Sequence, residues 1–154
     1  MAITINGNGT ISGVTSGAGK VLQMQQATSS TTVSGITSET LLTSVSITPL
    51  SSTSSILLLA EGYLYSVPTG NPYSIGWIRV RHGSTAGTGG TDLGAWSGGV
   101  DHNTGCYLSI PFIGSHSPGA TNQIIYSMTC GKGSGNTASV TAYKCGIFAV
   151  EVEA

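Results

Sequence analysis

The hydrophobic pattern along the chain is that of β-strands, and residues 41–67 show it most clearly. Residues 41–47, LLTSVSI, alternate between two unlike sides, which is the signature of a strand with two different faces. Pro49 and a Ser/Thr-rich link follow, and residues 56–60, ILLLA, are apolar on both faces, as in a strand inside a sandwich. This stretch predicts a hairpin of two long strands, one of them largely buried.

Similar runs predict about eight strands in all, separated by turn signals. Beyond the hairpin they cover residues 20–28, 73–82, 106–112, 122–130 and 138–152. Residues 84–91, a Gly-rich bend around Trp96 and residues 101–105 indicate loops or turns. No segment predicts a helix. The pattern favours an all-β fold, an antiparallel β-sandwich or jelly roll with an extended N-terminal arm.

Residues 1–19 stand apart from the predicted sandwich domain at residues 20–154. Asn-Gly pairs between short β-type runs indicate a small hairpin here, and a two-stranded hairpin is marginal on its own. We therefore expect an arm that becomes ordered on another chain. Its partner-binding residues are the four large apolar ones, Ile3, Ile5, Ile11 and Val14.

Composition and charge narrow the classes of partner. Ser (22), Thr (20) and Gly (23) supply 65 of 154 positions, while charged residues supply 7%, against about 25% in an ordinary soluble domain. A net charge of −1 offers no electrostatic footprint for nucleic acid or an anionic membrane. The longest apolar run, residues 56–60, is too short for membrane insertion, and no secretory signal is visible. We expect neither nucleic acid nor membrane as a partner.

Three widely spaced cysteines, Cys106, Cys130 and Cys145, form no CxxC pair. An odd count without such a pair argues against a disulfide framework or a structural zinc site. We interpret them as small apolar strand residues of a protein made in a reducing cytoplasm.

No motif in the chain predicts catalysis, a metal or a cofactor. Residues 13–21 approach a phosphate loop, but Val21 stands where the magnesium-binding hydroxyl is needed, so they are interpreted as a glycine hinge. There is no GxSxG elbow. Glu61, directly after the apolar run, is interpreted as a charge at an exposed strand edge or paired with an Arg rather than as a catalytic carboxylate. The histidines His82, His102 and His116 lie in or beside predicted turns and are interpreted as solvated.

The aromatic residues cluster in one third of the chain. Ordinary core packing is the favoured interpretation of Tyr63 and Trp77, while Trp96 is the best candidate for exposure. With its neighbours it makes a candidate surface-ligand loop of Trp96, Asp101 and His102.

Three segments together resemble small structural proteins of tailed bacteriophages, especially those infecting marine bacteria and cyanobacteria. They are residues 2–19 (AITINGNGTISGVTSGAG), residues 20–28 (KVLQMQQAT) followed by 40–59 (TLLTSVSITPLSSTSSILLL), and the ending VEVEA. The group often has Lys where this chain has Ser55, and residues 68–135 carry no motif that matches. The resemblance implies a β-sandwich on tail-fibre or particle-surface proteins, commonly a homotrimer, with no catalytic residue.

Taken together, these observations predict a non-enzymatic virion protein on the particle exterior, synthesised in the host cytoplasm. One alternative is a trimeric capsid decoration protein, anchored to other virion proteins by its arm. The other is a tail-fibre or receptor-binding tip that recognises host-surface glycans. The lack of a heptad shaft or long repeat favours decoration.

Overall fold

The computed structural model describes residues 19–68, 73–101, 106–133 and 137–153, together with two short strands at 4–5 and 11–12. The regular structure in these residues is all β, as predicted. The strands are β1 (Thr4–Ile5), β2 (Ile11–Ser12), β3 (Val21–Ser29), β4 (Val33–Ile36), β5 (Thr40–Ile47), β6 (Ser55–Pro68), β7 (Tyr73–Gly83), β8 (Thr91–Asp101), β9 (Cys106–His116), β10 (Ile124–Lys132) and β11 (Thr137–Val152). β1 pairs antiparallel with β2, so the predicted hairpin in the arm is present. The described part of the chain holds no helix long and apolar enough to cross a membrane.

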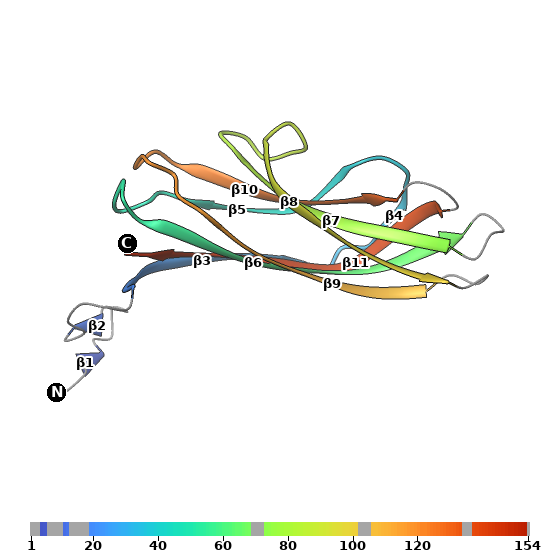
Figure 1. Cartoon of the computed structure of the whole chain (residues 1–154), viewed down its shortest axis with the longest axis horizontal. Helices are drawn as coiled ribbons and strands as arrows, with labels where there is room; N and C mark the ends of the chain where they lie inside the picture. The colour runs from blue at the N-terminus through green and yellow to red at the C-terminus, as the bar shows by residue number, and fades with distance from the viewer. Residues whose placement is uncertain are drawn as a thin grey trace.

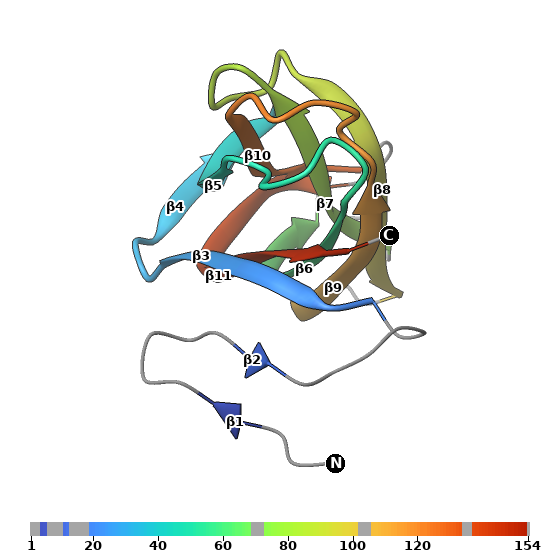
Figure 2. The same cartoon turned by 90° about the vertical axis from the view of Figure 1, so that its left-hand side faces the viewer.

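Two antiparallel sheets pack face to face as a jelly roll (Figure 1). One sheet has the order β5-β10-β7-β8, and the other has the order β3-β11-β6-β9, with β4 pairing on the β3 side of β11. From β4 onward, successive strands alternate between the sheets, except for the β7–β8 hairpin. Figure 2 shows the two layers facing each other, and the buried residues of both sheets form one hydrophobic cluster. The prediction of an all-β sandwich or jelly roll is confirmed.

The predicted hairpin at residues 41–67 is wrong, because its two strands belong to different sheets. β5 pairs with β10, whereas β6 pairs with β11 on one side and β9 on the other. The physical reason is burial. Each strand has an apolar face, and in separate sheets these faces meet across the core, so that Ile47 is 2% exposed while Ile56 and Leu58 are fully buried. If the two strands were neighbours in one sheet, the same residues would line only one side of the core.

The core lies between the sheets and contains mostly alternate, inward-facing residues of each strand. Its fully buried large apolar side chains include Tyr126, Ile47, Ile56, Leu58, Leu64, Ile78, Met128 and Ile147. Gly62 interrupts the large side chains of β6 at a point of close approach. A Cβ there would lie 2.9 Å from side-chain atoms of Ile78 and of Met128 on the opposite sheet. Glycine therefore lets the two sheets approach each other at this position.

The C-terminal strand β11 turns its acidic side inward. Ala149 and Glu151 are fully buried, while Phe148 and Val150, which alternate with them in sequence, are only half-buried on the outer side. If the more apolar face of β11 were buried, Phe148 and Val150 would point inward and Glu151 would point outward. The outer side of β11 is therefore unusually apolar for a surface.

Buried Glu151 is fully hydrogen-bonded and holds the link between β5 and β6. Its carboxylate accepts hydrogen bonds from Ser54 Oγ (2.6 Å), Gln23 Nε2 (2.6 Å), Leu50 N–H (2.8 Å) and Ser51 N–H (3.2 Å). Burial by itself raises the pKa of Glu151, but these four hydrogen bonds outweigh it and lower the pKa. The Glu151 carboxylate thus connects β11 to strand β3 and to the link between β5 and β6.

Two strands lie where the sequence predicted loops. β4 falls in a Ser/Thr segment, where its one buried apolar residue, Ile36, carries too little periodicity to be recognised. β8 falls on the predicted Gly-rich bend around Trp96. These glycines lie within the strand and make no turn: Gly94 has a φ of +137°, which favours glycine, and a Cβ on Gly98 would lie at ordinary contact distance, 3.5 Å, from Ile110.

Two of the three cysteines lie in described strands with described side chains. Cys130 is buried and Cys145 half-buried, and both are free thiols. Burial raises the pKa of Cys130 to about 12, so its thiol stays protonated. Both behave as the small apolar strand residues that the sequence predicted.

Candidate functional site on the outer face of one sheet

The outer face of the β3-β11-β6-β9 sheet carries large apolar side chains where a solvated face would be polar. In the strand register Leu59 lies beside Phe148 of β11 and Ile113 of β9. Leu59 is 39% exposed and Ile113 is 63% exposed. The next row along the same strands is also mostly apolar. We refer to these two rows as the apolar half of the face: Met24, Leu57, Leu59, Ile113, Phe148 and Val150.

The other half of this face holds four tyrosines from β6, β9 and β11. Tyr63 and Tyr107 stack with their centroids 5.4 Å apart and their rings 7° from parallel. Tyr65 lies 4.8 Å and Tyr143 lies 5.8 Å from Tyr107. We refer to these four residues as the tyrosine cluster. Their rings combine apolar bodies with hydroxyl groups, so they suit contacts that are partly apolar and partly wet.

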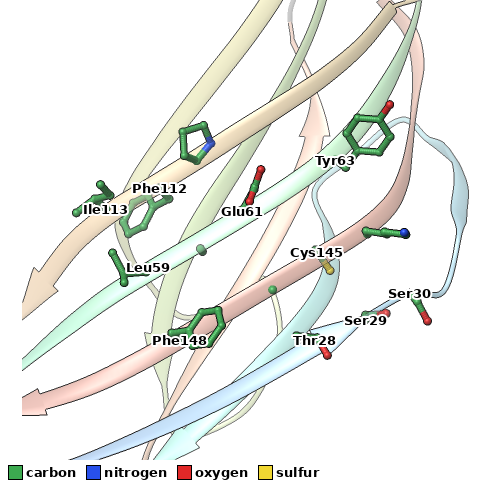
Figure 3. Close-up of a pocket in the computed structure, with 14 residues that line it drawn as sticks. Thr28, Ser29, Ser30, Leu59, Glu61, Tyr63, Phe112, Ile113, Cys145 and Phe148 are labelled. Atoms are coloured by element: carbon green, nitrogen blue, oxygen red, sulfur yellow. The ribbon is translucent and has the colours of Figure 1, made fainter.

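A shallow groove of about 870 Å³ lies between the two halves (Figure 3). Thr28, Ser29 and Ser30 give it one hydroxyl-rich side. Glu61 projects beside it from the central strand β6, with Ser109 Oγ donating a hydrogen bond to its carboxylate. Glu61 is thus exposed, as expected, but it is not at a sheet edge. The charged residues that line the groove are Glu61 and, from β11, Lys144.

The outer face of the other sheet carries a network of paired charges beside Leu41, which is 37% exposed, and half-buried Trp77. Glu39 is the centre of the network. Its carboxylate accepts hydrogen bonds from Arg81 Nε (2.7 Å), Arg81 Nη2 (2.8 Å), Arg79 Nη1 (3.1 Å) and Thr129 Oγ1 (2.7 Å). Arg79 also lies 3.0 Å from the Asp92 carboxylate. The hydrogen bond from Arg81, with smaller contributions from Thr129 and the arginine charges, lowers the pKa of Glu39 to about 2 despite the opposing effect of burial.

Two histidines pack inside one end of the sandwich, and their interpretation as solvated residues is wrong. His82 of β7 and His116 of β9 lie with ring centroids 4.1 Å apart, both half-buried. His116 Nδ1 is 2.8 Å from the hydroxyl of buried Tyr126. Burial, and then the neighbouring His82, lower the pKa of His116, which favours its neutral form. No group of three metal-ligating side chains occurs among the described residues.

Two aromatic residues expected in the core lie on outer faces instead. Tyr63 is 40% exposed and belongs to the tyrosine cluster. Trp77 lies on the β5-β10-β7-β8 sheet, where its indole N–H donates to the Lys132 carbonyl (2.8 Å) and the Arg79 guanidinium lies 4.8 Å from its ring. Tyr65, two positions along β6, lies on the same outer face as Tyr63. No local sequence pattern predicts that Tyr107 and Tyr143 join the tyrosine cluster.

The sequence-predicted site residues lie at two other places. In the arm Ile5 pairs with Ile11 in the β1–β2 ladder, while Ile3 and Val14 lie outside the described residues. In the predicted surface-ligand loop, Trp96 is 50% exposed on strand β8. Asp101 is the last residue of that strand, and His102 lies outside the described residues. The structure does not join either group to the groove, and their binding roles stay predictions.

Comparison with known proteins gives fold-level likenesses alone. No protein-family model and no curated protein matches the chain. Among solved structures, a chain of the infectious bursal disease virus Gx strain matches with a TM-score of 0.45 and 16% identity over 99% of this chain. The VP2 subviral particle of the same virus matches with a TM-score of 0.39 and 15% identity over 99% of this chain. Bacillus endospore appendages, described as disulfide-linked pili, match with a TM-score of 0.32 and 14% identity over 94% of this chain and 99% of theirs. This chain spans 37% and 38% of the two viral chains, and similarity at this level carries no argument about function.

Proposed function

We propose that this chain is a non-enzymatic structural protein of a virus particle, joined to its neighbours through the outer face of the β3-β11-β6-β9 sheet. The observation that carries the proposal is the apolar half of that face. Four of its residues, Met24, Leu57, Leu59 and Ile113, are between 36% and 63% exposed. A contiguous apolar patch on an otherwise neutral, hydroxyl-rich surface is typical of a protein interaction site. Its place on a rigid sheet suits assembly.

Within this class, the resemblance to tailed-phage proteins supports a homotrimeric decoration protein on the capsid exterior. The arm at residues 1–19 would provide the anchor, and the sandwich at residues 20–154 would form the exposed body. The described part of the chain holds no long shaft that would project the sandwich from the particle. A jelly roll is also a fold that capsid proteins use, which supports the assignment by analogy alone.

Quantitative mass spectrometry of purified particles tests this function. A decoration protein is expected in hundreds of copies per particle, whereas a few to a few dozen copies would indicate a fibre. Leu59→Asp should lower incorporation, because it places a charge in the apolar half. Ser46→Asp, at an exposed position on the other sheet, is the matched control and should be incorporated normally. Absence of the wild-type chain from purified particles would contradict a virion role.

The tyrosine cluster favours a second function, recognition of host-surface glycans by a tail-fibre or receptor-binding tip. Exposed tyrosines beside a groove with hydroxyl groups offer both stacking surfaces and hydrogen-bond partners to a sugar ring. A glycan array with the wild type, Tyr107→Ala and Trp96→Ala discriminates the two candidate places. Loss of signal in Tyr107→Ala alone would locate binding at the cluster, and loss in Trp96→Ala alone would support the predicted surface-ligand loop. A wild-type protein that binds no glycan would contradict this function.

A further inference from the structure

The apolar half of the outer face is without a cover in a single copy of the described chain. Its six residues come from four strands that are held together by continuous pairing, so the surface is preformed. None of the six is charged; the groove beside it holds the charges Glu61 and Lys144. A partner for this surface must therefore be apolar and uncharged.

The described sandwich begins at the edge of this same sheet, with strand β3. Glu153 N–H donates to the Lys20 carbonyl (2.8 Å), and a Cβ on Gly19 would lie 2.9 Å from the Glu153 carbonyl oxygen. The chain is thus still in line with β3 at residue 19. Figure 1 shows that the start of β3 and the C-terminus share one end of the sandwich.

The preceding residues have the chemistry that the apolar half requires. Residues 1–18 contain no charged side chain, and their large apolar residues include Ile5 and Ile11, which pair in the β1–β2 ladder. A two-stranded ladder this short needs an apolar surface to pack on. With β1 and β2 paired, the seven Cα steps from Ser12 to Gly19 span at most about 25 Å, enough to reach the face of a copy that packs beside this sheet.

We propose that residues 1–18 of one copy pack on the apolar half of a second copy, so that the arm joins subunits in trans. The inference rests on the proposed function in one respect, since it identifies the contact by which the particle protein self-assembles. It also differs from an arm that binds a shell protein's strand edges. The occupant is a segment of this chain, and the acceptor is the row formed by Leu59, Phe148 and Ile113.

Complementation between two full-length variants tests the proposal. The arm variant, Ile5→Asp with Ile11→Asp, keeps an intact acceptor face, and the face variant, Leu59→Asp with Phe148→Asp, keeps an intact arm. By sedimentation velocity the wild type should be oligomeric, and each variant alone should dissociate with a Kd raised at least about 100-fold, given the apolar burial lost. An equimolar mixture should form a one-to-one complex, because one intact arm meets one intact face. Asn8→Asp and Ser46→Asp are the matched controls and should assemble as the wild type does.

Three results would overturn the proposal. An arm variant as oligomeric as the wild type would mean that the face binds something other than the arm. A wild type that stays monomeric would mean that the arm does not join copies. A mixture that forms no complex would mean that arm and face do not contact each other. In each case the chain could still be found in purified particles, so failure of the trans contact and failure of the virion role are distinguishable. Circular dichroism of both variants, which change outer or arm residues, should match the wild type.

Discussion

The two sheets of the sandwich share one core, but the side chains on their outer faces differ in chemistry. On the β5-β10-β7-β8 sheet, the carboxylate of Glu39 accepts hydrogen bonds from Arg79 and Arg81. In the 84–90 loop over this sheet, Gly87 N–H donates a hydrogen bond to Ser127 Oγ (3.0 Å). On the β3-β11-β6-β9 sheet, the corresponding surface is an apolar half and a tyrosine cluster.

The difference shows which surface a single copy completes by itself. On the first face the charged groups of Glu39, Arg79, Arg81 and Asp92 pair with one another within the chain, so this network needs no second molecule. Apolar side chains on the second face gain nothing from water, and their burial needs another molecule or segment. We therefore place function on the second face and stability on the first. The following predictions test that division, from the largest expected effect to the smallest.

Glu151→Ala should cause the largest loss of stability, because both sheets depend on the link that this carboxylate holds. Removing it leaves the N–H groups of Leu50 and Ser51 without their acceptor, while Ser54 Oγ and Gln23 Nε2 keep only the carbonyls of Ser51 and Thr48. We expect a loss of about 3 kcal/mol or more in the free energy of unfolding, measured by urea denaturation. Glu153→Gln, at an exposed position two residues later, should change it by less than about 0.5 kcal/mol. Equal losses in the two variants would contradict this role of Glu151.

Glu39→Gln and Glu61→Gln compare one carboxylate from each outer face. The lowered pKa of Glu39 corresponds to its contacts with two arginines, and after a discount for partial exposure we expect a loss of about 2 kcal/mol. Glu61 is exposed, so its substitution should cost less than about 0.5 kcal/mol. Urea denaturation at neutral pH measures both, and a larger effect at Glu61 would reverse the proposed division between the faces.

The lowered pKa of Glu39 predicts that the free energy of unfolding depends on pH. The pKa of Glu39 is lowered from 4.5 to about 2, so its stabilising contribution is complete above pH 4.5 and is lost as the pH falls through about 2. Glu151, whose pKa is also lowered, acts in the same direction. Unfolding free energies of the wild type and Glu39→Gln should therefore converge as the medium is acidified across this range. A constant difference between them would show that Glu39 does not act through its charge.

A smaller pH effect on stability is expected from His82 and His116, which lie inside one end of the sandwich. The pKa of His116 is lowered from 6.5, so its neutral form stabilises the fold above pH 6.5 and this contribution is lost as the pH falls through its folded-state pKa. The melting temperature of the wild type should decline on mild acidification below pH 6.5. His116→Phe should remove that part of the decline, whereas an unchanged profile would exclude His116 as its cause.

Ile113→Ser should have the smallest effect on stability and still change association. At 63% exposure the side chain buries little in one copy, so the free energy of unfolding should change by less than about 0.5 kcal/mol. If the apolar half is an interface, the same substitution should weaken self-association in sedimentation equilibrium. A large loss of stability without weaker association would instead assign Ile113 to the fold of the single copy.

Much of the fold could be predicted from local patterns, but the candidate site could not. The period-2 signal located most strands, and the neutral composition pointed away from nucleic acid. The tyrosine cluster was hidden because Tyr63, Tyr107 and Tyr143 come from three strands far apart in sequence. The glycines of β8 were misread as a bend, because glycine occurs both in turns and within strands.

By itself the sequence determined the strand content, the all-β class and the near absence of charge, because these follow from alternation and composition at each position. Only the tertiary structure decided which sheet each strand joins and which side of each strand faces inward. Residues 41–67 read as one hairpin, since alternation says nothing about the neighbour of a strand. On β11 both sides are apolar enough to be buried, and the inward side holds Ile147, Ala149 and Glu151, whose carboxylate is hydrogen-bonded there. Phe148 and Val150 therefore face outward, on the face where function is proposed.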